Sequence, residues 1–434
     1  MSSIPIPYKI RNQHIYIPGK TRHGKSTLMH RMAYQDIMNG HGVCVIDPKG
    51  DLVNSLLHWI PTERVNDCIY IEPHHPIPFD LLDYDPKNTR EKDTLIGELK
   101  FVITKNLNTD GTPLMNAILN DIIHTLLDAN ENGLDPPATF IDIHDFLALK
   151  GRRDKIMNYV SSPRYQERWD EHNFPNPKDR QPTLTRMNGY VTSDYLAKAF
   201  GCPKPELNIA RAMDEQKILL VNLGGIDEPS KLFATLLIAK IRQAAYRRAS
   251  IPEPLRIPFH LYVDEFEFFQ TKDFEEILSV AGGYGLRLTL ANQFMGQLDS
   301  NIKDSILGNV GSFIIFCVSQ ADARDFKNFA VEAGGTDADL ANLPKYQALY
   351  KIAEAKAIVK SSLPPAPLPT NSHADYIKKR TLARYSCKSG DVRDNPSSDS
   401  TSDKNADDAP QKQKGRPPVP PLGTKQGNNP GPRR

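Results

Sequence analysis

The sequence predicts an α/β protein in which a mainly parallel sheet is flanked by helices and interrupted by an inserted all-α domain. Three observations support this class. Short apolar runs alternate with amphipathic helical segments near both ends of the expected core, and these runs are unbroken. The strand pattern then disappears between about residues 88 and 214. Parallel strands joined through helices are covered on both faces, so they appear as continuous apolar runs.

The first expected strand, His14–Pro18, leads into a loop that fits the pattern G-x-x-x-x-G-K-[ST]. The loop residues are Gly19, Lys20, Thr21, Arg22, His23, Gly24, Lys25, Ser26 and Thr27. Helical spacing follows over Ser26–Asn39. A strand, a glycine loop and a helix in this order bind phosphate, because backbone N–H groups and the positive end of the helix dipole face the same anion. The alternative to a phosphate-binding loop is a glycine-rich turn with a solvated lysine.

This loop predicts a site for a nucleoside triphosphate and Mg²⁺. We expect Lys25 to reach the β- and γ-phosphates and the Ser26 hydroxyl to ligate Mg²⁺. A second apolar run, Phe259–Val263, ends in Asp264 and Glu265. Asp264 is expected to hold the Mg²⁺ shell, and Glu265 to act as the base for the attacking water. The alternative is a strand end that happens to be acidic.

A polar amide follows another expected strand, Leu286–Ala291. Gln293 comes just after this strand, at the carboxyl edge where ligands bind in open parallel sheets. It is expected to sense the γ-phosphate or to orient the water. Glu267 lies close to the two acids in sequence and is expected to be solvated.

The rest of the core follows the same pattern. Further strands are expected at Val43–Asp47, Cys68–Ile71, Lys217–Leu223 and Phe313–Val318, with a hairpin over Tyr346–Val359. Core helices are expected at Leu52–Ile60, Ser230–Arg248 and Phe274–Val280. Helices of the insert are expected at Glu91–Leu107, Thr112–Asp128, Ile143–Leu149, Asp154–Ser161 and Thr183–Ala199. The predicted division is therefore a nucleotide-binding core at 1–87 and 215–360, an all-α domain at 88–214, a proline-rich connector with a short helix at 361–386, and a disordered tail at 387–434.

Composition excludes several classes. The formal net charge of +2 is nearly neutral, so any surface for nucleic acid must be local. Five cysteines lie far apart without a C-x-x-C pair, which predicts neither a zinc site nor a disulfide framework and favours a reducing compartment. No apolar run approaches the ~18 residues of a membrane helix, and residues 1–9 do not resemble a signal peptide. We therefore expect a cytoplasmic protein that reaches a membrane only through a partner.

Several stretches together resemble one family, the type IV secretion coupling proteins, which are conjugative DNA-transfer ATPases of the HerA/FtsK superfamily. The matching stretches are the phosphate loop, Val45–Asp51, Lys217–Leu223, Val263–Phe266 with Gly285–Gln293, and Ile306–Gly311. This resemblance implies a RecA-like P-loop NTPase core that carries an all-α domain, works as a homo-oligomeric, hexameric ring and pumps DNA with ATP. It also implies relaxase or secretion-channel proteins as partners.

The sequence departs from the family pattern in two places. Family members typically carry N-terminal membrane helices, whereas this sequence begins one strand before its phosphate loop. The family also often has an arginine at the position of Gly282, where it would reach the nucleotide of a neighbouring subunit. Arg287 and Arg324 are candidate substitutes, with a surface salt bridge as the alternative role for each.

Three functions remain open at this point. The first is an ATP-driven DNA translocase of the coupling-protein type. The second is a HerA-like helicase that acts with a nuclease, against which the missing N-terminal barrel domain of those proteins argues. The third is a nucleotide-switched scaffold that recruits substrates to a secretion apparatus with little turnover.

Overall fold

The computed structural model describes residues 11, 13–105, 112–270, 272–352, 359–362 and 372–387. Within this part of the chain, nine strands form one sheet in the order β3-β4-β2-β5-β6-β1-β7-β8-β9. The strands are β1 Ile15–Pro18, β2 Gly42–Asp47, β3 Cys68–Ile71, β4 Ile218–Asn222, β5 Phe259–Val263, β6 Leu286–Asn292, β7 Ser312–Ile315, β8 Gln347–Lys351 and β9 Val359–Ser362. Every pair from β3 to β7 is parallel, whereas β8 and β9 run antiparallel. The predicted mainly parallel α/β fold is confirmed.

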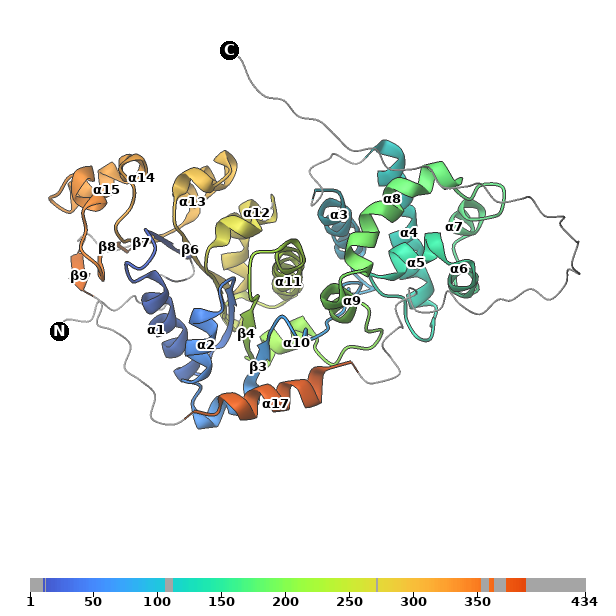
Figure 1. The fold of residues 1–434 in the computed structure, drawn as a ribbon, viewed down its shortest axis with the longest axis horizontal. Helices are drawn as coiled ribbons and strands as arrows, with labels where there is room; N and C mark the ends of the chain where they lie inside the picture. Colours follow the sequence, from blue (N-terminus) through green and yellow to red (C-terminus); the bar gives the residue numbers. More distant parts are fainter. Residues whose placement is uncertain are drawn as a thin grey trace, which may run out of the picture. The chain divides into compact units, whose positions relative to one another are not determined.

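Helices cover both faces of this sheet (Figure 1). The core helices are α1 Lys25–Met38, α2 Asp51–Leu57, α11 Glu228–Arg247, α12 Lys272–Val280 and α13 Ser300–Asn309, and after β7 come α14 Gln320–Asp325, α15 Lys327–Glu332 and α16 Asp337–Ala341. Apolar residues of α1 and α2 form one core with one face of the sheet. Those of α11 and α13 form a second core on the other face, and this core continues into the inserted helices. The unbroken apolar strands thus have both faces buried, as predicted.

All helices described between β3 and β4 belong to the insert. They are α3 Thr89–Lys105, α4 Pro113–Glu131, α5 Asp142–Ala148, α6 Lys150–Met157, α7 Pro163–Arg168, α8 Pro177–Val191, α9 Asp194–Phe200 and α10 Ile209–Asp214. The single helix predicted over Thr183–Ala199 is wrong, because the chain breaks into α8 and α9. Ser193 takes an extended conformation, and its hydroxyl accepts the N–H of Leu196, which caps a new helix. The domain boundaries at residues 88 and 214 stay a prediction.

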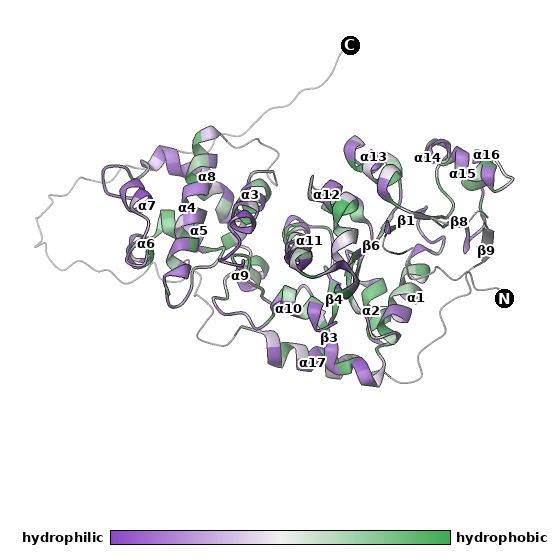
Figure 2. Cartoon of the chain, turned by 180° about the vertical axis from the view of Figure 1, so that it is seen from behind, coloured by the Kyte–Doolittle hydropathy of each residue, from purple (hydrophilic) through white to green (hydrophobic). Residues whose placement is uncertain are grey.

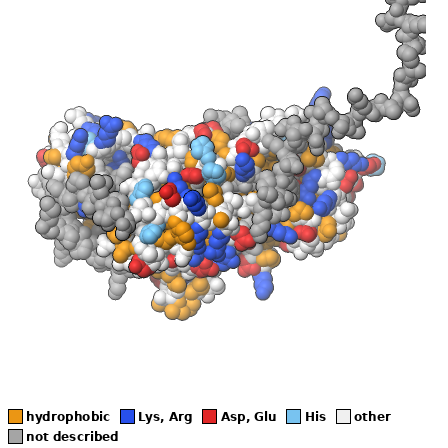
Figure 3. All heavy atoms as spheres, turned by 60° about the horizontal axis from the view of Figure 1, so that its bottom comes forward, with side chains coloured by type: hydrophobic (Ala, Val, Ile, Leu, Met, Phe, Trp, Pro, Cys, Tyr) orange, Lys and Arg blue, Asp and Glu red, His pale blue; other side chains and the backbone are white. Residues whose placement is uncertain are grey.

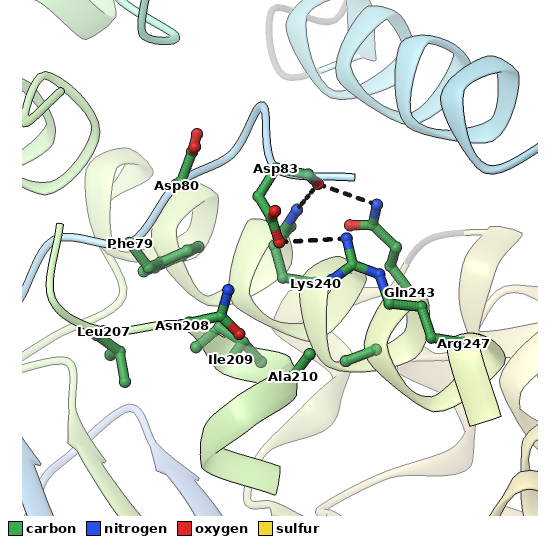
Figure 4. Close-up of a pocket in the computed structure, with 11 residues that line it drawn as sticks. Phe79, Asp80, Asp83, Leu207, Asn208, Ile209, Ala210, Lys240, Gln243 and Arg247 are labelled. Carbon is green, nitrogen blue, oxygen red and sulfur yellow. Dashed lines mark hydrogen bonds and ion pairs between the residues drawn. The ribbon is translucent and has the colours of Figure 1, made fainter. Parts of the chain in front are cut away.

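The two segments that connect the sheet with the insert meet beside α11. Phe79 on the way in forms a parallel bridge with Leu207 on the way out. The carbonyl oxygen of Asp83 accepts hydrogen bonds from Lys240 Nζ at 2.6 Å and Gln243 Nε2 at 3.1 Å, and these groups border a small cavity (Figure 4). Burial lowers the pKa of Lys240 to about 8. Side chains of α11 therefore hold the entry segment in place.

A last helix, α17 Ala374–Tyr385, packs on β3, the edge strand of the sheet. Hydrophilic and hydrophobic residues alternate along it, as expected for a helix with one buried face (Figure 2). The Thr381 hydroxyl accepts the backbone N–H of Tyr70 at 3.3 Å, which satisfies a donor that an open edge would leave unpaired. Figure 3 brings this side forward and shows basic and acidic side chains interspersed on it.

A disulfide joins Cys202, at the end of the insert, to Cys387, just after α17, with Cα atoms 5.9 Å apart. The cysteine spacing predicted no disulfide framework and did not reveal this bond, so the argument for a reducing compartment loses its basis. The partners are 185 residues apart, so only the folded chain brings them together. The other three cysteines are free and buried.

Two predictions fall largely outside the described residues: the proline-rich stretch of the connector and the disordered tail. Among the residues that are described, no helix has both the length and the apolar character needed to cross a bilayer.

Candidate nucleotide site

The phosphate loop follows β1, and the carboxyl ends of β6 and β7 lie on either side of it. The start of its backbone is fixed on two sides, since Gly19 N–H donates to Asn292 O at 3.2 Å and Lys20 N–H to Cys317 O at 2.7 Å. Gly24 has φ 117°, which favours glycine, and a Cβ there would lie 3.0 Å from the Phe316 ring. A Cβ on Gly19 would lie 2.6 Å from Phe316 Cβ. The glycines are thus required by close packing against the chain after β7.

The side chains of this loop differ in exposure. Thr21, Arg22 and Ser26 are exposed, Lys20, His23 and Thr27 are half-buried, and Lys25 is buried. The Lys25 ammonium donates to the carbonyl oxygens of Gly19 and, at 3.2 Å, of Lys20. Burial lowers the pKa of Lys25, and the carboxylates of Asp264 and Glu265 oppose this shift. The lysine is therefore a cation held inside the loop, where a phosphate group could take over its contacts.

The acids after β5 lie beside this loop although they are more than 200 residues away in sequence. The Ser26 hydroxyl donates to Asp264 Oδ2 at 3.2 Å. Asp264 is buried, and this burial, with the nearby charge of Asp47, raises its pKa to about 6 against the opposing charge of Lys25. A hydroxyl and a carboxylate oxygen this close together fit two neighbouring positions around Mg²⁺, a cation that prefers oxygen ligands.

Glu265 is held by two side chains from neighbouring strands. Its Oε1 accepts a hydrogen bond from Gln293 Nε2 at 2.7 Å and forms an ion pair with the ammonium of Lys49, whose side chain is half exposed. Its backbone is left-handed, with φ 47°, a conformation unfavourable for a residue with a side chain. Such outliers cluster at functional sites because the surrounding structure must enforce them. The structure thus brings Lys25, Ser26, Asp264, Glu265 and Gln293 to one edge of the sheet.

Two residues at the end of β2 belong to this edge and were not predicted as site residues: Asp47, the last residue of the strand, and Lys49 in the loop that follows. Lys49 contacts Glu265. Burial lowers the pKa of Lys49, but the hydrogen bond to Glu265 and the negative charge of Glu265 raise it by more, so the pKa of Lys49 is raised overall. Asp47 accepts the backbone N–H groups of Lys49, Leu52 and Val53, which fixes the loop. The signal that could have identified them is their position at the end of an apolar run. Because β2 pairs with β5 in parallel, the carboxyl ends of these two strands lie side by side.

The expectation that Glu267 is solvated is wrong. Both of its carboxylate oxygens are buried, and neither has a hydrogen-bond partner within the usual geometric limits. Burial raises the pKa of Glu267 to about 7, although nearby backbone N–H groups of Glu267 and Gln293 oppose the shift. Glu267 lies in the turn of 3-10 helix, Phe266–Phe269, that follows Glu265.

The two candidate arginines lie in different surroundings. Arg287 is buried and is the second residue of β6, so it lies near the amino end of the strand, away from the phosphate loop. The alternative role predicted for Arg287, a surface salt bridge, is therefore wrong, because this residue is not at the surface. Arg324 lies on α14, which follows the carboxyl end of β7, and it is exposed. Of the two, only Arg324 is placed to reach a neighbouring molecule.

Comparison with known proteins agrees with this arrangement. Residues 258–357 match the family model for the TraM recognition site of TraD and TraG. No curated protein is significantly similar to this chain in sequence. Among solved structures, the bacterial conjugative coupling protein TrwBdeltaN70 in its unbound monoclinic form is 15% identical and has a TM-score of 0.62, covering 85% of this chain and 89% of that chain.

Two further structures have the same fold. The plasmid coupling protein TrwB in complex with a non-hydrolysable ATP analogue is 16% identical, with a TM-score of 0.62 and coverage of 85% of this chain and 90% of that one. VirB4 of Thermoanaerobacter pseudethanolicus is 13% identical, with a TM-score of 0.54 and coverage of 82% and 90%. The fold is therefore that of a RecA-like P-loop core. The family match and this fold confirm the predicted resemblance of the chain to the ATPases of conjugative coupling proteins.

Proposed function

We propose that this chain is a nucleotide-driven motor ATPase of the coupling-protein type, which hydrolyses ATP with Mg²⁺. One observation carries the proposal: the Ser26 hydroxyl lies 3.2 Å from Asp264 Oδ2, and Glu265 follows at the same sheet edge, although these acids come from a distant strand. The solved structures of TrwB with an ATP analogue and with ADP and Mg²⁺ support the same ligands for this fold.

The residues divide the work of hydrolysis. Lys25 and the loop N–H groups bind the β- and γ-phosphates, while Ser26 and Asp264 would hold Mg²⁺, which supplies positive charge next to the phosphates when bound. Water attacks the γ-phosphorus, the bond to the β–γ bridging oxygen breaks, and ADP leaves. Glu265 accepts the proton of that water. Gln293 and Lys49 orient the Glu265 carboxylate through the contacts described above.

The Glu265 carboxylate provides the sharpest test of this assignment. Glu265→Gln keeps the size and the hydrogen bonding of the side chain but removes the base, so it should bind ATP with unchanged affinity and lose at least about 100-fold in hydrolysis rate. Lys25→Ala should lose binding as well. Nucleotide affinity and steady-state phosphate release would be measured for both variants. Normal turnover in Glu265→Gln would reject the assigned base.

We also propose that the motor moves DNA through a homo-oligomeric ring, with Arg324 supplying charge to a neighbouring subunit's nucleotide. We further propose that a relaxase or channel partner holds the motor at a membrane. A scaffold that recruits a protein partner is the second candidate, and the match to a TraM recognition region favours it.

DNA separates the two candidates. For the motor, ATP hydrolysis should rise several-fold with single-stranded or duplex DNA, and the rise should weaken with salt because phosphate contacts release counterions. For the scaffold, partner binding should depend on nucleotide while turnover stays low with or without DNA. Solution mass with an ATP analogue, with and without DNA, would report the ring.

A further inference from the structure

Tyr346, just before β8, lies against the phosphate loop from the side opposite the catalytic acids. Its backbone N–H donates to His23 O at 2.9 Å. Its ring approaches the loop so closely that a Cβ on Gly24 would lie 3.2 Å from Tyr346 Cδ1. The buried ring of Phe316 supports Gly24 from the chain after β7. Tyr346 is nevertheless 38% exposed, so part of this side chain faces solvent.

The backbone of Tyr346 is unusual in the same way as that of Glu265. Its φ is 62°, in the left-handed region that an aromatic residue rarely adopts. Neither glycine nor asparagine occupies the position, although both would fit this conformation at lower cost. Conformations of this kind persist where the surrounding structure enforces them, and they concentrate at ligand sites. An exposed aromatic ring held in this way beside a phosphate loop therefore points to a ligand.

The strand order shows which part of a nucleotide would meet this ring. The loop follows β1, which lies between β6 and β7. Asp264, Glu265 and Gln293 follow β5 and β6, so a terminal phosphate cleaved there lies on the β6 side of the loop. The remainder of the nucleotide then extends toward the β7 side, where Tyr346 enters β8 next to β7.

We propose that Tyr346 stacks on the base of the bound nucleoside triphosphate, an inference that rests on the proposed function. Aromatic rings stack on every base because each base has a π-face, and such a contact fixes the base with little conformational entropy loss. The ring would therefore add affinity that the phosphate contacts of Lys25 and Ser26 do not supply. It would also favour purines, whose larger ring system offers more stacking area.

The test compares ATP with inorganic triphosphate, which has the phosphates but no base, by calorimetric titration with Mg²⁺ present. Tyr346→Gly removes the ring and suits the left-handed backbone, so this variant should fold. We expect ATP to bind it about tenfold more weakly than the wild type, the size expected for one lost stacking contact, and triphosphate to bind unchanged. Tyr346→Phe keeps the ring and should bind both as the wild type does. Tyr376→Ala, a change at an exposed tyrosine of α17, is the matched control and should alter neither affinity.

The outcomes are distinguishable. Unchanged ATP affinity in Tyr346→Gly, or equal losses for ATP and triphosphate, would overturn the stacking contact and leave the proposed function standing. A wild-type chain that binds neither ligand would overturn the proposed function and this inference with it.

Discussion

Three carboxylates within four residues of β5's end have different surroundings, and these differences assign their roles. Asp264 faces the Ser26 hydroxyl, Glu265 is bound by Lys49 and Gln293, and Glu267 is buried with no hydrogen-bond partner in the usual geometry. Sequence position alone could not separate them. Burial raises the pKa of Asp264 to about 6 and that of Glu267 to about 7, because a charged carboxylate is costly away from water.

Glu267 should make stability depend on pH. Its pKa is about 7 in the folded chain, against an ordinary 4.5, so the folded state holds this proton more tightly. Its charged form destabilises the fold, and this effect is absent below about pH 4.5, grows as the pH rises, and is complete above pH 7. Glu267→Gln should therefore raise the free energy of unfolding by about 2 kcal/mol more at pH 8 than at pH 5.

Urea unfolding at both pH values would check this, with Glu332→Gln on the exposed surface as the control. The readout is the difference between the two pH values, because a buried amide has its own cost that pH does not change. An equal effect of Glu267→Gln at pH 5 and pH 8 would contradict the prediction.

At the scale of elements, the order of strands brings the site together. β6 lies between β1 and β5, so the amide after β6 can bridge the loop after β1 and the acids after β5. Because these strands are parallel, their carboxyl ends share one edge. The same logic places Lys49, which follows β2, next to Glu265. The sequence revealed each strand end but not the neighbours of each strand.

Helix α17 should contribute to stability through its buried face. Ile377 is fully buried between α17 and the sheet, so Ile377→Ala should lower the free energy of unfolding by about 2–4 kcal/mol through lost burial and the cavity left behind. Tyr376→Ala, one residue away and 54% exposed, should change it by less than about 0.5 kcal/mol. Denaturant unfolding of both variants tests whether the helix is docked as described; equal effects would show that it is not.

At the scale of the whole molecule, the Cys202–Cys387 disulfide ties the end of the insert to the segment after α17. Cross-linking residues 185 apart restricts the unfolded chain, and a disulfide of this kind typically stabilises by about 2–4 kcal/mol. Reduction should therefore lower the free energy of unfolding by about that amount. The Cys387→Ser variant should already be less stable and should not respond to reductant. If reductant does not change the free energy of unfolding of the wild-type chain, the bond does not form in solution.

The sequence by itself determined the α/β class, the all-helical insert and the phosphate loop. These depend on local information: unbroken apolar runs, helical spacing, and glycines at fixed positions before Lys25. It also determined the acids after β5, because a strand end is visible as the point where an apolar run stops.

Only the tertiary structure decided which of these groups meet. Three contacts join segments that are far apart in sequence: Lys49 with Glu265, Tyr346 with Gly24, and the Cys202–Cys387 bond. The burial of the Glu267 carboxylate oxygens likewise depends on the packing of the folded chain. Such contacts depend on the order of strands in the sheet and on the packing around each side chain. Periodicity and spacing within one segment of the sequence reveal neither the strand order nor this packing.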